Sequence, residues 1–203
     1  MTFVEFFKGI PQRMRFRINF LTVFEFLYAL SIPFIISYAP PQLFVENSWF
    51  ENMQLFILLV AFILALRAPH DKKLFMAVAL IIVLMLLRET NMGRSYFCEK
   101  YLSPDEMCRW KKLKYGFIAE PLRNLYGLYI LYYIWRQKVY QTFFRYVLHA
   151  PIYVFDISIL ILSAVAATLA EHPLIDNEIL EESCEMLMYL AFLNNLWFYR
   201  KLG

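Results

Sequence analysis

Six long apolar segments alternate with short polar ones along the chain. They lie at about residues 18–39, 48–66, 73–91, 115–135, 149–170 and 177–199. Each is close to the roughly 20 residues that an α-helix needs to cross a hydrocarbon core of about 30 Å. No internal repeat or heptad pattern accompanies them. The pattern predicts an all-α fold, a polytopic membrane bundle of six transmembrane helices.

The composition agrees with this pattern. Of the 203 residues, 61% are hydrophobic and only 18% are charged, and the mean hydropathy is +0.49. Such values are more typical of a polytopic membrane protein than of a soluble domain. The few glycines form no flexible linker, so we expect one transmembrane domain over residues 1–203. The basic residues flank apolar segments and no nucleic-acid motif is present, so nucleic acid is not an expected partner.

The distribution of Lys and Arg predicts the orientation. With the N-terminus inside, the cytoplasmic segments carry twelve of them, whereas the outer loops at residues 39–47 and 171–176 carry none. The stretch from Arg88 to Lys114, which includes the long loop 92–114, carries seven. The count favours cytoplasmic termini and a periplasmic loop 92–114. We expect a multi-pass protein of a bacterial inner (plasma) membrane.

The first 17 residues form a predicted amphipathic juxtamembrane arm. Its basic residues, Lys8, Arg13, Arg15 and Arg17, stand among phenylalanines. Such an arm lies on the inner leaflet and binds anionic lipid. The bilayer and its anionic lipids are therefore expected partners, and other membrane proteins remain an open alternative.

Two of the three cysteines, Cys98 and Cys108, fall in the long outer loop. On an oxidising face they would close a small disulfide ring. The alternative is two unpaired thiols. Cys184 lies inside the last apolar segment, where we expect a small packing residue.

The last apolar segment opens with many carboxylates. Glu178, Glu182, Glu185 and Tyr189 share one helical face at about 100° per residue, with Glu181 beside it. Acids favour a helix N-terminus capped by Asp176 or Asn177, which accounts for Glu178. Glu185 lies roughly 12 Å further in at about 1.5 Å per residue. A charge at that depth needs a partner, a proton or a wet cavity.

Four of the six predicted helices place charge in the same outer third. Helix capping explains some of it, because Ser48-x-x-Glu51 is a capping-box pattern. Glu89 is different, since it lies at the end of its helix, where an acid opposes the helix dipole. We therefore predict an outer cluster that binds ligand, made of Glu51, Arg88, Glu89, Arg94, Glu120, Arg123, Glu178, Glu182 and Glu185.

The outer cluster contains six acids and three arginines, which cannot all be ionised in a low-dielectric pocket. Either some carboxylates hold a proton, or a bound cation supplies the missing charge. The first alternative suits proton-coupled transport or acid/base catalysis, and the second suits a divalent cation held by oxygen ligands. No other cofactor is evident. Zinc is not expected, because only His172 lies on this face.

A second, deeper pair of acids is predicted nearer the inner boundary. Glu25 in the first segment and Asp156 in the fifth both lie about seven residues from that boundary. They could form a proton-sharing pair. The alternative, which is the more ordinary one, is that each bonds a neighbouring Tyr or Asn within a packed bundle.

Two resemblances bear on function. The chain resembles a loose group of uncharacterised small polytopic bacterial inner-membrane proteins in three motifs. These are the acid-opened second span, Arg88-Glu89-x3-Gly93-Arg94 and Glu181-Glu182-x2-Glu185. This likeness implies a location and no activity. Cys98-Glu99, Ala119-Glu120-Pro121 and Asn124 resemble the opening motif of ceramidase-like membrane hydrolases. Those enzymes carry three zinc-binding histidines. Here the topology puts His70, His149 and His172 on opposite faces, so that metal site is not carried over.

The expected function is the binding or transport of a polar or lipid-linked ligand at a periplasm-facing Glu/Arg pocket, with a cation or proton beside it. Arginines suit a phosphate or carboxylate headgroup. The alternative is a membrane enzyme acting on a lipid headgroup with a glutamate as general base. A structural subunit of a membrane complex is the third.

Overall fold

The computed structural model describes residues 11–40, 43, 49–90, 116–172, 175 and 177–202, without the side chains of Gly116, Ala119 and Glu120. Apart from one pair of two-residue strands, the regular structure of these residues is helical. The helices are α2 (Phe20–Tyr38), α3 (Trp49–Leu66), α4 (Lys72–Glu89), α6 (Gly116–Arg136), α7 (Val139–His149), α8 (Val154–Ala170) and α9 (Glu178–Tyr199). The predicted all-α class is confirmed.

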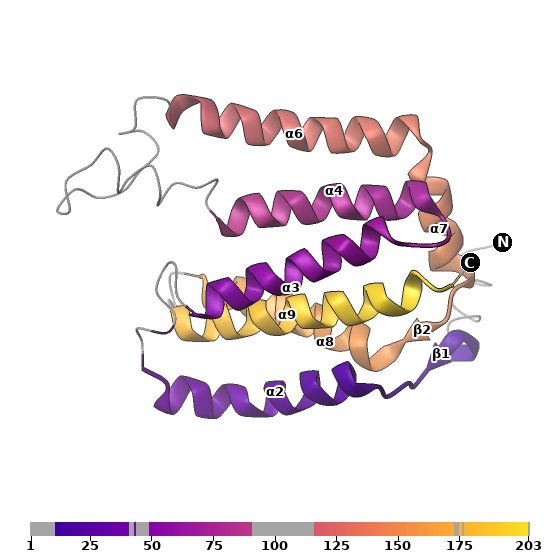
Figure 1. Ribbon diagram of the computed structural model, residues 1–203. Coiled ribbons are helices and arrows are strands. Elements are labelled where there is room, and N and C mark those ends of the chain that lie inside the picture. Colours follow the sequence, from indigo (N-terminus) through magenta and orange to yellow (C-terminus); the bar gives the residue numbers. More distant parts are fainter. Residues whose placement is uncertain are drawn as a thin grey trace.

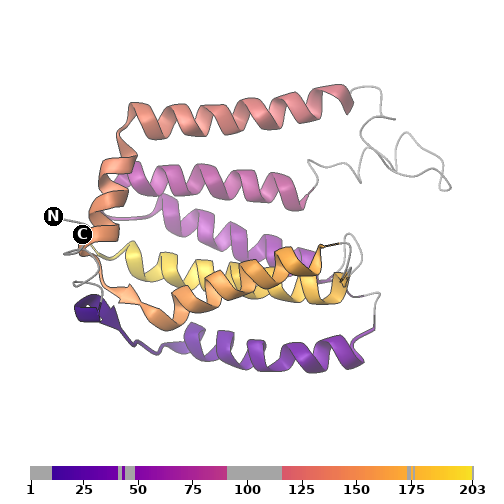
Figure 2. The same cartoon turned by 180° about the vertical axis from the view of Figure 1, so that it is seen from behind.

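The long helices run side by side, and α9 lies in the middle (Figures 1 and 2). It packs against α2, α3 and α8, while α3 also packs against α4, and α6 lies beyond α4. The core is built from α3, α4 and α9, with Leu58, Ile82 and Tyr189 fully buried. Buried alanines such as Ala61 and Ala79 occupy the same core, because small residues let helices approach closely. Of these helices, α9 has the most buried residues.

Helix α7 was not predicted. The sequence pattern places residues 136–148 in an inner loop, but the chain forms a short amphipathic helix that crosses one end of the bundle (Figure 1). Its apolar residues are too few and too interrupted to resemble a span. Leu202, the last described residue, contacts Tyr146 of α7.

The fifth helix also starts later than predicted, at Val154 rather than residue 149. Pro151 explains this, because it favours an extended residue before it, and Ala150 is extended with ψ 151°. Strand β2 (Ile152–Tyr153) follows and pairs in parallel with β1 (Met14–Arg15). The described part of the predicted N-terminal arm is therefore tied to the start of α8, and residues 1–10 lie outside the described residues.

Two of the described helices, α2 and α3, are long and apolar enough to cross a membrane, and α8 is apolar but shorter. This is a weak indication of membrane association, since the core helix of a soluble protein or a signal sequence meets the same criteria. Helices α4, α6 and α9 carry more charged or polar residues, among them Arg88 and Glu89 at the end of α4 and Glu182 and Glu185 in α9.

Candidate functional site

The carboxylates of α9 contact α3 and α4 at the end of the bundle opposite to α7. Glu185 forms an ion pair with Arg88 of α4. Glu182 accepts a hydrogen bond of 2.8 Å from the side-chain amide of Gln54 in α3. Tyr189 donates to Glu89 Oε1 at 2.6 Å. Three helices are thus joined through acidic side chains.

The local spacing explains why these groups meet. Glu182, Glu185 and Tyr189 follow one another at three and four residues, so they lie on one face of α9. Asn177 caps the helix by accepting a bond of 2.9 Å from Leu180 N, which sets its register. Glu178 is exposed in the first turn, the ordinary place for an acid, and it does not join the contacts with α3 and α4.

Burial differs sharply between the acids and the arginine. The side chains of Glu89 and Glu185 are each 7% exposed, whereas the side chain of Arg88 is 56% exposed. Arg88 Nε also lies 3.8 Å from Glu89 Oε1. The guanidinium therefore reaches from the surface onto two buried carboxylates, and part of it stays open to a ligand.

Acids outnumber arginines among these described residues. Glu51 of α3 is close enough to Glu89 to repel its carboxylate, and Glu182 is near both Glu89 and Glu185. Arg88 is the arginine whose ion pairs reach this group within the part of the chain that the structure describes. The surplus of negative charge suits a proton or a positively charged group.

The other predicted members of the outer cluster are placed differently. Arg123 is exposed on α6, and none of the ion pairs between described residues includes it. Arg94, Cys98 and Cys108 lie outside the described residues, and so does the side chain of Glu120. Cys184 is buried as a free thiol.

The predicted outer cluster did not include two partners, Gln54 and Tyr189, although periodicity placed Tyr189 on the same face as the acids. Both are fully buried, and each bonds an acid across a helix interface. Tyr189 shares a face with Glu185, and Gln54 shares a face with Glu51. Each of the two residues lies about one helical turn from an acid of the predicted outer cluster. That spacing is the sequence signal that could have identified them as partners.

No divalent-metal site is formed by the described residues. Over the described ranges, no group of three or more His, Cys, Asp or Glu side chains is arranged to hold a metal ion.

The deeper acids, Glu25 of α2 and Asp156 of α8, are both buried against α9. Asp156 Oδ1 accepts bonds from Thr22 Oγ1 at 3.1 Å and from Asn194 Nδ2 at 3.0 Å. We call Thr22, Glu25, Asp156 and Asn194 the inner group. Asn19 caps α2 and also donates to Asn194 at 2.9 Å, so the inner group joins three helices.

Hydrogen bonding in the inner group is incomplete. The Glu25 carboxyl lies close enough to Asn194 to interact with it, but neither of its oxygens makes a hydrogen bond of normal geometry in the described structure, and nor does Asp156 Oδ2. No ion pair between described residues includes them. Buried polar atoms in native proteins are almost always bonded, often to water. The packing alternative, in which each acid bonds a neighbouring Tyr or Asn, agrees with the bond from Asn194 to Asp156 and with the closeness of Asn194 to Glu25. It leaves both oxygens of Glu25 and one of Asp156 without a hydrogen bond of normal geometry in the described structure.

Further buried polar atoms lie between the inner group and Glu182. Tyr28 is one turn from Glu25, and it lies near Ser183 and Glu182 of α9. The buried hydroxyls of Tyr28 and Ser183 are close enough to interact with each other, but neither makes a hydrogen bond of normal geometry in the described structure. We call Tyr28 and Ser183 the polar link. From Asn194 to Glu182, α9 rises about 18 Å at about 1.5 Å per residue, and the polar link lies within that span.

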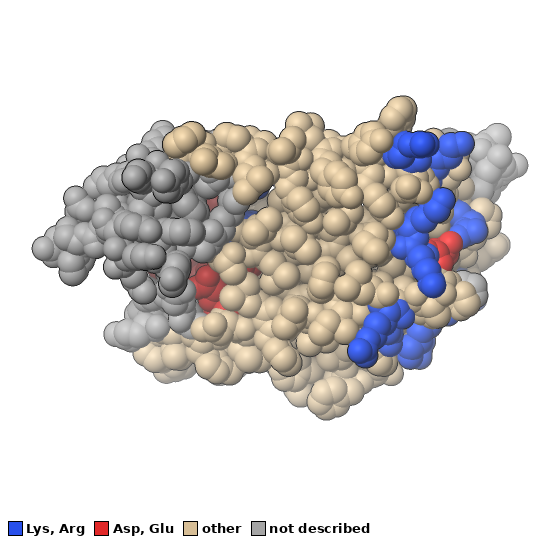
Figure 3. All heavy atoms as spheres, turned by 45° about the horizontal axis from the view of Figure 1, so that its top comes forward, with Lys and Arg blue, Asp and Glu red and all other residues tan. Residues whose placement is uncertain are grey.

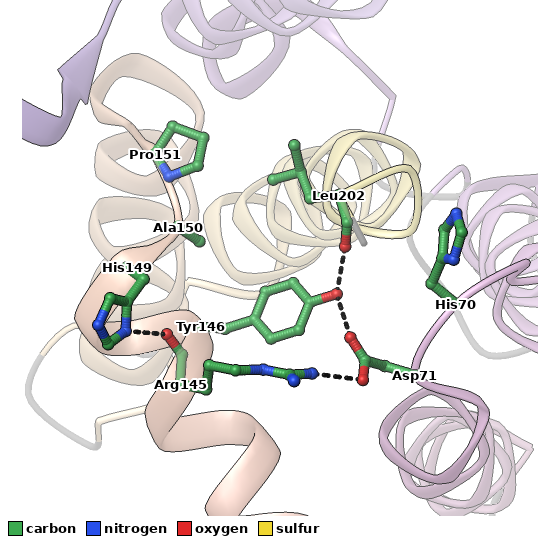
Figure 4. A pocket seen from close by; sticks show the side chains of 8 residues that line it. All are labelled: His70, Asp71, Arg145, Tyr146, His149, Ala150, Pro151 and Leu202. Atoms are coloured by element: carbon green, nitrogen blue, oxygen red, sulfur yellow. Dashed lines mark hydrogen bonds and ion pairs between the residues drawn. The ribbon is translucent and has the colours of Figure 1, made fainter.

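A third polar group lies at the α7 end, in an open pocket of about 540 Å³ (Figure 4). Arg145 Nη2 of α7 pairs with Asp71 Oδ1 at 2.5 Å. The hydroxyl of Tyr146 lies 2.8 Å from Asp71 Oδ2 and also contacts the carbonyl oxygen of Leu202. Burial and the bond to Asp71 raise the pKa of Tyr146 to about 12, so its phenol stays neutral and donates. These bonds hold α7 against the loop before α4.

Comparisons with protein-family models, with curated proteins and with solved structures found no match to the chain. The two resemblances drawn from sequence motifs therefore stay predictions, and the function is argued from geometry.

A double-mutant cycle tests the Arg88–Glu185 ion pair. Arg88→Gln should lower the free energy of unfolding by about 1–3 kcal/mol, because Glu185 is left buried without its partner. Adding Glu185→Gln should recover part of that loss, as expected for coupled residues. The measurement is chemical unfolding of the purified chain. Arg123→Gln is the matched control, and its effect should stay within about 0.5 kcal/mol. Equal effects of Arg88→Gln and Arg123→Gln would show that the ion pair contributes nothing.

Proposed function

We propose that the protein is a six-span integral protein of a bacterial inner (plasma) membrane, with both termini in the cytoplasm. In this proposal it transports a polar or lipid-linked ligand that binds at the outer cluster, coupled to protons through the inner group. Four features of the molecule support the proposal.

The first is a broad apolar surface. Large apolar side chains are exposed along α2, α6 and α8, among them Leu27, Leu125 and Leu162. Figure 3 shows a wide band without Lys or Arg between the two ends of the molecule. A water-soluble monomer rarely exposes such an area, whereas a bilayer covers it.

The second is the separation of charge. Lys and Arg gather at the α7 end in Figure 3, and acidic side chains are visible towards the other end. A basic end is the usual cytoplasmic end of a membrane bundle. This supports an outer position for Glu89, Glu182 and Glu185.

The third feature is the observation that carries transport: α9 is flanked by buried carboxylates in both of its halves, with the polar link between them. An enzyme confined to the outer end has no need of Glu25, which sits fully buried in the inner half. A carboxylate in hydrocarbon without a partner costs several kcal/mol. A proton or water at Glu25 removes much of that cost, and the polar link lets a proton move towards Glu182.

The fourth feature indicates the ligand. The half-exposed guanidinium of Arg88 offers donors suited to phosphate or carboxylate, and guanidinium binds both in a bidentate manner. The neighbouring surplus of carboxylates suits a proton or an amine on the same ligand. A polar ligand with an anionic group, either free or linked to a lipid, fits both.

Reporter fusions test the proposed six-span topology. A reporter fused after Gly203 should show activity typical of the cytoplasm, and one inserted within residues 104–111 should show activity typical of the periplasm. The reason is the bias of Lys and Arg between the two sides. Matching signals from the two fusions would contradict the six-span topology.

The coupling is tested with the full chain in liposomes. Proton flux driven by an imposed membrane potential should exceed that of empty vesicles. It should fall by about tenfold or more in Glu25→Gln and Asp156→Asn, because an amide cannot take up and release a proton. Glu171→Gln, at an exposed acid outside the outer cluster and the inner group, is the matched control and should keep the wild-type flux.

Two outcomes would contradict coupling. One is a wild-type flux no greater than that of empty vesicles. The other is wild-type flux in folded Glu25→Gln and Asp156→Asn proteins, which would favour the alternative of a membrane enzyme confined to the outer cluster.

A further inference from the structure

A deep apolar groove opens at the α7 end of the bundle, on the opposite half of α9 from the outer cluster. It has a volume of about 500 Å³, within the range of about 300–1,000 Å³ that is usual for small-molecule sites. Its sides come from Val78 of α4 and Leu160 of α8, and Leu196 lines it from α9. Phe143 and Val147 of α7 lie across its end.

Three polar side chains of this groove donate to backbone carbonyl oxygens of the protein, while Asn195 Oδ1 is buried without a hydrogen-bond partner in the described structure. Tyr199 donates to the carbonyl oxygen of Pro151 at 2.9 Å. The amide of Asn195 donates to Ala191 O at 2.8 Å. Arg13 donates to Val147 O at 2.6 Å. The remaining lining is mostly aliphatic and aromatic, so an occupant should be a hydrocarbon chain.

The groove adjoins the polar pocket of Figure 4. The two share Tyr146, Ala150 and Pro151 as lining residues. The pocket adds Arg145 and His149, which come from the same helix. The apolar groove thus adjoins a polar pocket, lined by Arg145, Asp71 and two histidines, across residues that line both.

The polar pocket has capacity for an anion. The side chain of Arg145 is 60% exposed, and its bond to Asp71 uses one of the five guanidinium donors. Asp71, the acid of this pocket, is already bonded to Arg145 and Tyr146. Other Lys and Arg residues gather at this same end of the molecule (Figure 3). The charge is complementary to a phosphate group.

We propose that the groove and the pocket together bind one anionic phospholipid. One acyl chain occupies the groove between α4, α8 and α9, and the phosphate headgroup contacts Arg145 and His149. The proposal shares the membrane location with the proposed function and is independent of transport, because neither the outer cluster nor the inner group lines the two cavities.

Native mass spectrometry of the purified full chain in detergent tests this proposal. Three probes are compared: dioleoyl phosphatidylglycerol, dioleoyl phosphatidylcholine and inorganic phosphate. We expect one phosphatidylglycerol to be retained about fivefold more tightly than phosphatidylcholine, the contribution of about one cationic side chain. Inorganic phosphate should not be retained, because it lacks the chain that fills the groove.

Two pairs of variants assign the groove and the headgroup pocket. Leu160→Trp fills the groove and should abolish selective retention of phosphatidylglycerol. Its control is Leu162→Trp on the same helix, where the residue is 67% exposed. Arg145→Gln should weaken the preference for phosphatidylglycerol about fivefold, whereas Arg136→Gln should leave it unchanged. Should Leu160→Trp fail to fold, Val78→Phe fills the same groove from α4.

The proposal is overturned by equal retention of the two lipids by the wild-type chain. It is also overturned if a folded groove-filling variant retains phosphatidylglycerol as its control does. Binding of inorganic phosphate as tight as that of phosphatidylglycerol would show an anion site without a lipid chain, and would likewise reject it.

Discussion

The burial of carboxylates around α9 is the constraint on which the rest of the structure depends. α9 lies between α2, α3 and α8, so its polar side chains face other helices rather than solvent. Burying an ionised group without a partner costs several kcal/mol. Polar residues on the other helices form hydrogen bonds or ion pairs that offset this cost. Gln54 of α3 bonds Glu182, Arg88 of α4 pairs with Glu185, and Asp156 of α8 accepts bonds from Thr22 of α2 and Asn194 of α9.

The two halves of α9 meet this constraint in different ways. In the outer half, Glu182 and Glu185 each have a partner on another helix, and so does Glu89 of α4. In the inner half, Glu25 lies near Asn194 of α9 but makes no hydrogen bond of normal geometry among the described residues. Complete pairing is what a purely structural polar contact needs. Incomplete pairing at Glu25 is therefore what distinguishes a site for a proton or water from simple packing, and it is the basis of the transport proposal.

The sequence predicts the helices well because apolar length and charge placement are local properties. The face shared by Glu182, Glu185 and Tyr189 also follows from helical periodicity alone. What it could not predict is which helix each acid meets. Gln54 rather than an arginine bonds Glu182, and Arg123 stays on the surface of α6. Those outcomes depend on how helices pack, which single-sequence patterns do not contain. Helix α7 was missed for a related reason: its amphipathic pattern is stabilised by tertiary contacts such as Arg145 with Asp71.

The central claim is that the interior along α9 is hydrated between Glu25 and Glu182. A structure of the protein in lipid nanodiscs, at a resolution that shows ordered water, tests it most directly. The account predicts density for water or an ion in contact with the Glu25 carboxyl group and with the hydroxyls of Tyr28 and Ser183. A dry interface would contradict it, with Glu25 bonded directly to Asn194 and Tyr28 bonded directly to Ser183.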